Sequence, residues 1–191
     1  VKLMSKHSFW KLHRPTNTMP LKVKPVLLWL LLIALLAAGC SSNKSYRADH
    51  FDVDLVLQPE NVLLVTETVQ FRFQGGPFTY AYRDLERDGL DAIDQIEADM
   101  DGAPLPRGNN AGEVEIEDGD SLRITWHFAP VHDSTHTFTL RYRVLGAVRQ
   151  EDGADVLRWY ALPPEHCYPI TEATFRLRPP ANVTPLAAPR V

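Results

Sequence analysis

The chain has 191 residues, with 20 basic and 24 acidic side chains and a formal net charge of −4. This total hides a division: residues 1–39 hold six basic side chains and no acidic one, which leaves 14 basic against 24 acidic groups on the rest. A body of net charge −10 repels phosphate backbones and argues against nucleic-acid binding. The hydrophobic fraction of 45% is enough for a packed core and argues against wholesale disorder.

A hydrophobic segment runs without interruption from Val26 to Ala38. As a helix it would span about 20 Å, which is shorter than the ~30 Å hydrocarbon core of a bilayer. A short apolar run behind Lys22 and Lys24 is typical of a secretory signal. We therefore predict a signal peptide over residues 1–39, with Met19 as a second candidate for the start of translation.

The predicted signal ends in Leu36-Ala37-Ala38-Gly39-Cys40, which resembles the lipobox of bacterial lipoproteins, although Ala37 stands where leucine is commonest. The resemblance implies cleavage before Cys40 and a lipid on its thiol, followed by a polar tether over residues 40–46. Acyl chains supply the anchor, since each buried CH₂ contributes about 0.8 kcal/mol. The alternative is an ordinary thiol at Cys40 behind an uncleaved hydrophobic anchor.

Short alternating strands, separated by Pro, Gly, Asn and Asp, are predicted throughout residues 47–179. They cover residues 50–57, 62–73, 92–100, 113–117, 121–128, 136–145, 155–161 and 170–178. Asp118-Gly119-Asp120 indicates a hairpin between two of them. Residues 80–91 show the weakest strand pattern and are compatible with a helical turn.

Strands with one apolar face and no helices to cover a sheet favour two sheets packed face to face. We predict an all-β fold, an antiparallel β-sandwich of immunoglobulin-like character, with a barrel as the second choice. Residues 180–191 are rich in proline and alanine and are interpreted as a tail or the start of a linker.

Glu67 is the most informative polar residue. It shares its parity along the strand with apolar neighbours, so a period of two turns its carboxylate toward the core. A buried carboxylate needs a partner or a raised pKa. Arg83 is the predicted partner, with Arg141 or Arg143 as substitutes. We favour a structural ion pair over a role for Glu67 as an acid or base in a cleft.

His132 and His136 have a spacing that occurs in zinc sites. Asp133 is a candidate third ligand, and His166 and Cys167 add further ligand types. No motif completes a tetrahedral set, so we favour solvated loop histidines and predict no cofactor and no catalytic residue. If Cys40 carries a lipid, Cys167 is a lone thiol, which we expect to be buried and inert.

Aromatic side chains are expected mainly in the core, with Tyr80 and Tyr82 as the exposed pair. The acidic run from Glu113 to Asp120 alternates with Val114 and Ile116 and is interpreted as a solvated strand face, with calcium binding as a minor alternative.

Three segments together resemble the bacterial predicted membrane protein family known as domain of unknown function 2207. They are residues 51–55, 64–69 and 82–85, which read FDVDL, LVTETV and YRDL, and residues 157–160 and 169–170 fit the same pattern. The similarity covers about residues 46–183. It implies an exported β-rich domain, typically followed by transmembrane helices, and it supplies no catalytic residues.

These observations favour a non-enzymatic, lipid-anchored domain that faces the periplasm or the outside of the cell envelope. Its expected partners are the membrane, through Cys40, and an envelope protein. One rival is a hydrolase or metal-dependent enzyme that uses Glu67 or the histidines. The other is a truncated family member, because the sequence ends at Val191 without a second hydrophobic span.

Overall fold

The computed structural model describes residues 44–163, 166–181 and 183. The predicted signal peptide over residues 1–39, the lipidation site Cys40 and most of the tail at 180–191 lie outside the described residues. The elements are β1 (Ser45–Leu57), η1 (Pro59–Asn61), β2 (Val62–Gln74), β3 (Phe78–Leu85), β4 (Ala92–Met100), β5 (Ala103–Pro104), β6 (Glu113–Asp118), β7 (Leu122–Val131), β8 (Thr135–Leu145), β9 (Val148–Glu151), β10 (Ala154–Leu157) and β11 (Ile170–Arg178).

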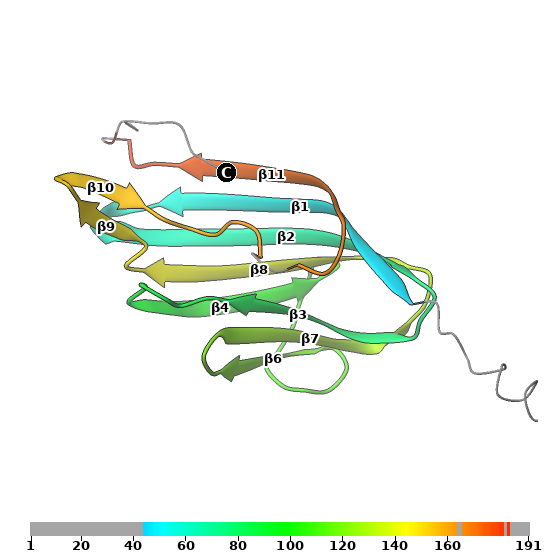
Figure 1. The fold of residues 1–191 in the computed structure, drawn as a ribbon. Coiled ribbons are helices and arrows are strands. Elements are labelled where there is room, and N and C mark those ends of the chain that lie inside the picture. Colours follow the sequence, from blue (N-terminus) through cyan, green and yellow to red (C-terminus); the bar gives the residue numbers. More distant parts are fainter. Residues whose placement is uncertain (1–43, 164–165, 182, 184–191) are drawn as a thin grey trace, which may run out of the picture. The chain divides into compact units, whose positions relative to one another are not determined.

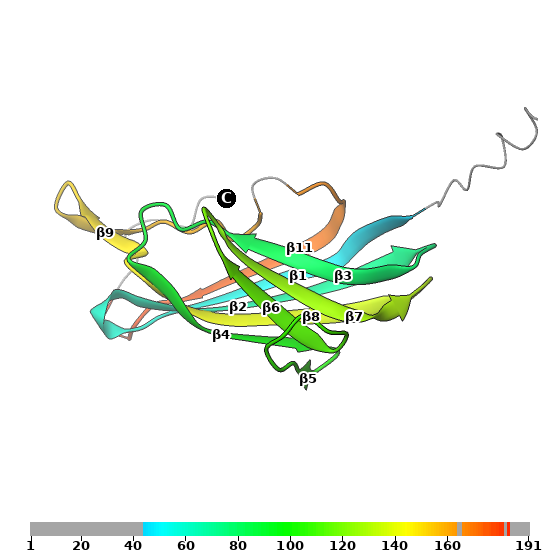
Figure 2. The same cartoon turned by 90° about the horizontal axis from the view of Figure 1, so that it is seen from below.

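The strands form a large sheet in the order β11-β1-β2-β8-β4-β5 and a three-stranded sheet in the order β3-β7-β6, while β9 and β10 pair as a hairpin (Figure 1). Seen from below, the three-stranded sheet lies across one face of the large sheet (Figure 2). The described part of the chain is therefore an all-β sandwich, as predicted. One pairing departs from the predicted antiparallel arrangement, because β11 runs parallel to β1.

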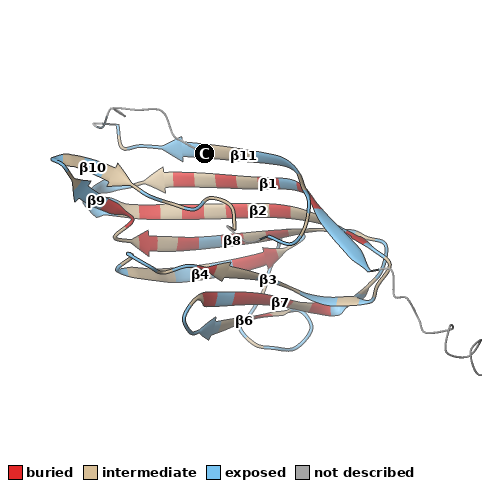
Figure 3. Cartoon of the chain, in the orientation of Figure 1, coloured by how far each residue is buried: buried red, intermediate tan, exposed pale blue. Residues whose placement is uncertain are grey.

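The core lies between the two sheets. Buried and partly exposed residues alternate along β1, β2 and β8, whereas β11 is largely exposed (Figure 3). Trp126 of the small sheet packs edge-on against Phe138 of the large sheet, with ring centroids 5.7 Å apart. Its indole N–H also donates to the backbone carbonyl of Asp99 at 3.1 Å. Apolar packing and a directed hydrogen bond therefore join the sheets at the same place.

Residues 78–85 form the edge strand β3, where the sequence indicated only a weak pattern compatible with a helical turn. The reason is an inverted distribution of polarity. Ala81 and Arg83 share their parity with the buried Leu85, whereas Tyr80 and Tyr82 are exposed. The inner face of β3 therefore carries an alanine and an arginine at positions where a hydrophobic pattern requires large aliphatic side chains.

The strand predicted over residues 155–161 is shorter than expected. Only Ala154–Leu157 forms β10, which pairs with β9 in a hairpin. The turn uses Asp152 and Gly153, which both have positive φ angles, 49° and 78°. An Asp-Gly pair between two strands is a recognised hairpin signal, which the prediction did not use here.

Candidate functional site

A buried carboxylate joins the two sheets. Glu67 of β2 is 2% exposed. Its Oε2 accepts a hydrogen bond from Arg83 Nε at 2.8 Å, and its Oε1 accepts one from Arg83 Nη2 at 3.0 Å. The hydroxyl of Tyr142 on β8 also donates to Oε1, at 2.7 Å. The structure thus brings together the two residues that the sequence analysis paired and adds a tyrosine that it did not foresee.

The electrostatics of this cluster favour a charged Arg83 beside a neutral Tyr142. Desolvation disfavours the charge on Arg83, but the charge and hydrogen bonds of Glu67 outweigh it and raise the pKa of Arg83 above its ordinary value. Burial, followed by the negative charge of Glu67, raises the pKa of Tyr142 well above its ordinary value. Tyr142 is therefore held as a donor, and both carboxylate oxygens of Glu67 are occupied.

The cavity beside the pair is small. It has a volume of about 30 Å³ and is lined by Glu67, Arg83, Tyr168 and surrounding aromatic rings. A space of this size holds about two water molecules, since each needs roughly 10–15 Å³ of this kind of volume. Burial raises the pKa of the Tyr168 hydroxyl to about 12. The arrangement can seal and align the sheets, but it offers no room for a substrate next to the carboxylate.

The alternative arginine partners face away from this cluster. Arg141 Nη1 donates to Asp99 Oδ2 at 2.7 Å, and Arg143 Nε donates to Asp94 Oδ1 at 2.7 Å. Both pairs join β8 to β4 and are partly exposed. Period-two alternation explains the result, because Arg141 and Arg143 flank Tyr142, which points inward.

The candidate metal ligands are dispersed. His136 Nδ1 lies 2.7 Å from Asp101 Oδ2, whereas His132 is exposed and Asp133 accepts a hydrogen bond from the backbone N–H of Gly75. His166 Nδ1 lies 2.9 Å from the carbonyl oxygen of Tyr168. Within residues 44–163, 166–181 and 183, no three His, Cys, Asp or Glu side chains are grouped so that they could hold a metal ion. This geometry gives the metal alternative no support.

Carboxylates of the acidic run each contact a different neighbouring side chain. Glu113 accepts hydrogen bonds from Asn110, Glu115 lies 2.9 Å from His127, and Asp118 pairs with Arg87. The carboxylates do not converge on one point. Cys167, which was expected to be buried, is exposed. That expectation was wrong because Cys167 lies in the irregular segment before β11, outside the sheet core.

Two tyrosines stand on the outer surface of the edge strand β3. Tyr80 and Tyr82 are 58% and 55% exposed. The guanidinium of Arg123 on β7 lies over the ring of Tyr82, 4.6 Å from its centroid, and also binds both carboxylate oxygens of Asp84. Tyr80 and Tyr82 form one surface together with the outward side chains of β7 and β6. We call this surface the tyrosine face.

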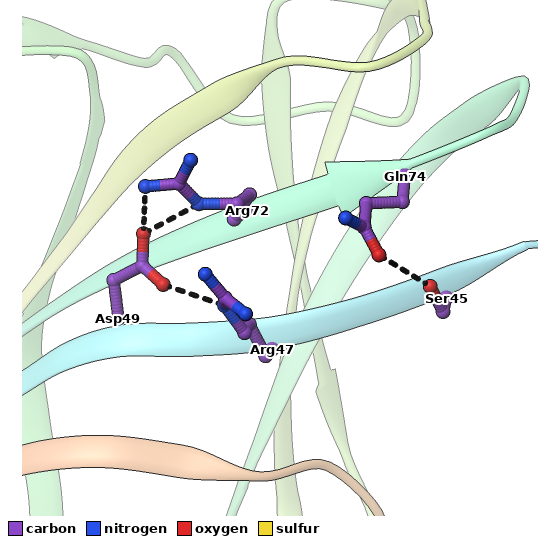
Figure 4. Close-up of polar contacts among 5 residues, drawn as sticks. All are labelled: Ser45, Arg47, Asp49, Arg72 and Gln74. Atoms are coloured by element: carbon purple, nitrogen blue, oxygen red, sulfur yellow. Dashed lines mark hydrogen bonds and ion pairs between the residues drawn. The ribbon is translucent and has the colours of Figure 1, made fainter.

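A second polar cluster escaped the sequence analysis. Asp49 forms a β-bulge, because Ala48 and His50 take successive partners on β2 and leave Asp49 unpaired. Its two oxygens accept hydrogen bonds from Arg47 Nε and Arg72 Nε, each at 2.8 Å (Figure 4). Hydrogen bonds from Arg72 and then Arg47 hold the pKa of Asp49 below its ordinary value. A bulge interrupts the period of two, so strand alternation alone does not reveal this cluster.

The solved structures with weak overall similarity include a hydrolase and a zinc metallopeptidase. The leukotriene A4 hydrolase from Saccharomyces cerevisiae has 17% identity and a TM-score of 0.38, over 59% of this chain and 18% of that chain. The M1 zinc metallopeptidase from Deinococcus radiodurans has 15% identity and a TM-score of 0.36, over 53% of this chain and 21% of that chain. This chain thus corresponds to about a fifth of each protein, and similarity at this level carries no information on activity.

A comparison with curated proteins finds no matching relative. None of the described residues form a helix with the length and apolar character needed to span a bilayer. The model of the N-terminal domain of a predicted membrane protein family, DUF2207, matches residues 47–188. The match confirms the resemblance found in the sequence and supports an association with membranes. The chain belongs to the DUF2207 family of predicted membrane proteins.

Proposed function

We propose that this protein is a lipid-anchored binding domain of the cell envelope, which faces the periplasm or the exterior and contacts a positively charged protein through its tyrosine face. The proposed binding role depends on one observation, which is that Tyr80 and Tyr82 are both more than half exposed on an edge strand. Tyrosine is enriched in protein interfaces because it combines a large apolar ring with a polar tip. Two such side chains in one exposed row favour a contact surface.

The charge of the partner follows from the charge around the tyrosines. Glu113, Glu115 and Glu117 lie on β6 in the same sheet, and Arg123 is already neutralised by Asp84. A tyrosine ring attracts a cation over its face, and the contact of Arg123 with the ring of Tyr82 within the domain is an example of this attraction. An arginine- or lysine-rich segment therefore fits both the acidic groups and the aromatic rings.

The anchor rests on the apolar run and the lipobox-like ending at Cys40. β1 begins at Ser45, so residues 41–44 lie between Cys40 and the first strand. Four extended residues reach at most about 14 Å. A lipid on Cys40 would therefore keep the domain close to the bilayer surface.

The enzymatic alternative gains little from the geometry. Glu67 has both oxygens occupied, and the cavity next to it has a volume of about 30 Å³. The histidines do not converge with other ligands among the described residues. A catalytic role for Glu67 would need a substrate pocket next to a free carboxylate oxygen.

The anchor is tested by mass spectrometry and membrane fractionation of the full-length protein beside Cys40→Ser. We expect diacylglycerol on Cys40 and a membrane-bound protein, and we expect the variant to lack the lipid. An intact chain that retains residues 1–39 and an unmodified Cys40 would overturn the lipid anchor.

Binding is tested with a fluorescent extended peptide of alternating arginine and alanine, measured by anisotropy at low and high salt. We expect Tyr80→Ala/Tyr82→Ala to weaken binding about tenfold or more, which corresponds to the loss of aromatic anchors. Tyr160→Ala is the matched control, because Tyr160 is 72% exposed but lies outside β3. Equal losses in both variants, or equal affinity for a glutamate–alanine peptide, would contradict the proposed tyrosine face.

A further inference from the structure

The first and last strands of the domain lie side by side and run in the same direction. β1 and β11 are paired at eight positions, from Ala48 opposite Ile170 to Val56 opposite Arg178. Because the two strands are parallel, the chain enters at one end of the sandwich and leaves β11 at the other (Figure 1). At about 3.3 Å per residue, Ser45 and Arg178 are separated by about 35 Å along the strand axis.

This topology determines how the domain responds to a pull on its two ends. A pull slides β1 toward its N-terminal end and β11 toward its C-terminal end, so all hydrogen bonds between them carry the load at once. The same pull also slides β1 along β2, which pairs with it antiparallel at twelve positions. Bonds loaded together must break together, whereas bonds loaded from one end break one after another.

Side chains strengthen the same contact. Asp54 of β1 lies 3.1 Å from Arg178 Nη2 and 3.7 Å from Arg176 Nη1 of β11, and His50 lies 3.3 Å from Glu172. On the inner face, the fully buried Val53 is opposite Phe175. The backbone ladder is continued by the N–H of Ala48, which donates to the carbonyl of Pro169 at 2.9 Å.

We propose that β1 and β11 form a mechanical clamp, which lets the domain transmit tension between its N-terminal end and the chain beyond β11 without unfolding. The inference goes beyond binding at the tyrosine face and uses none of its residues. The proposed lipid on Cys40 would fix one end of the clamp at the bilayer. The clamp itself depends only on the pairing of β1 with β11.

Single-molecule force spectroscopy on the full chain tests the direction of the load. In the first geometry, handles are attached at the two termini, so that β1 and β11 are sheared. In the second, handles are attached at the C-terminus and at Gln58→Cys, an exposed position at the far end of β1, with Cys40→Ser and Cys167→Ser removing the native thiols. This second pull peels β11 from β1 without changing any contact between them.

We expect the force at rupture to be about twofold or more higher in the terminal geometry at the same loading rate, since forced unfolding reports the barrier to unfolding. A matched pair of variants tests the side-chain contribution. Asp54→Asn removes the negative charge that pairs with Arg176 and Arg178, whereas Asp52→Asn changes the same strand at a residue with no ion pair among the described residues. Asp54→Asn should lower the terminal rupture force more than Asp52→Asn does.

Equal rupture forces in the two geometries would overturn the clamp, whatever the outcome of the peptide-binding experiment. Conversely, the rupture force could depend on the pulling direction while Tyr80→Ala/Tyr82→Ala leaves peptide binding unchanged. That result would support the clamp and contradict the role proposed for the tyrosine face. The two proposals therefore fail independently.

Discussion

The carboxylate of Glu67 in β2 and the guanidinium of Arg83 in β3 join the two sheets through hydrogen bonds of 2.8 and 3.0 Å. The side chains are 3% and 12% exposed, so both charges have lost most of their water. Desolvation offsets much of the attraction in such a pair, and its clearest effect is on specificity. A slip of β3 by one residue would bring Tyr82 or Asp84 to Glu67 in place of Arg83, and Asp84 would repel it.

Removing one partner of the pair should be far more harmful than removing both. Arg83→Met leaves Glu67 as an unpaired buried charge, and we expect the free energy of unfolding to fall by about 3–5 kcal/mol. The double variant Glu67→Leu/Arg83→Met should recover much of that loss, and the part not recovered is the cost of leaving the buried Tyr142 hydroxyl without its acceptor. Urea denaturation followed by tryptophan fluorescence measures both. A double variant as unstable as Arg83→Met would contradict this account.

A surface ion pair between β3 and β7 provides the control. Arg123 binds Asp84 with the same bidentate geometry, but its side chain is 47% exposed. Arg123→Met should therefore lower the free energy of unfolding by less than about 1 kcal/mol. If Arg83→Met and Arg123→Met lowered the free energy of unfolding by similar amounts, burial of the ion pair would not determine the size of the loss.

The sequence was sufficient to predict the inward direction of Glu67 and its partner, because strand alternation places side chains on faces without knowledge of the fold. It was not sufficient for Tyr142, whose hydroxyl reaches Glu67 across 75 positions of the chain. The β1–β11 pairing was hidden for the same reason: alternation identifies a strand but not its neighbour. The strand β3 was missed because Arg83 occupies a core-facing position that a hydrophobic pattern treats as polar.

Tyr142 should make the domain sensitive to base. Its pKa is raised above the ordinary value of 10.0, first by burial and then by Glu67, so the folded state keeps a proton that the unfolded state loses. Stability is then unaffected at neutral pH and falls as the pH rises above about 10. Denaturation curves from neutral to strongly basic pH measure this slope. Tyr142→Phe should flatten it, and an unchanged slope would contradict the assignment to Tyr142.

Gly76, in the turn between β2 and β3, is predicted to tolerate no side chain. It has a φ angle of +144°, and an added Cβ would lie 2.7 Å from the backbone oxygen of Val131. Gly76→Ala should lower the free energy of unfolding by about 2–4 kcal/mol, from backbone strain together with the steric clash. Gly102→Ala is the control, since Gly102 has a φ angle of +79° but nothing within 4 Å of the added atom. If both variants shifted the urea midpoint equally, backbone strain alone, without the steric clash, would explain the loss of stability.

Asp49 should make the stability of the domain sensitive to acid. The stability should fall as the pH is lowered, whereas the effect of Tyr142 makes it fall as the pH is raised. Hydrogen bonds from Arg72 and Arg47 hold its pKa below the ordinary value of 3.8, so the unfolded state takes up a proton before the folded state does. The stabilisation is complete above about pH 5 and is lost as the pH falls through the lowered pKa of the folded state. Asp49→Asn should therefore be less stable than wild type at neutral pH, and the difference should narrow toward pH 2. Asp52→Asn, which changes a carboxylate on the same strand, is the control. A constant difference across this pH range would mean that Asp49 acts through the shape of the bulge and not through its charge.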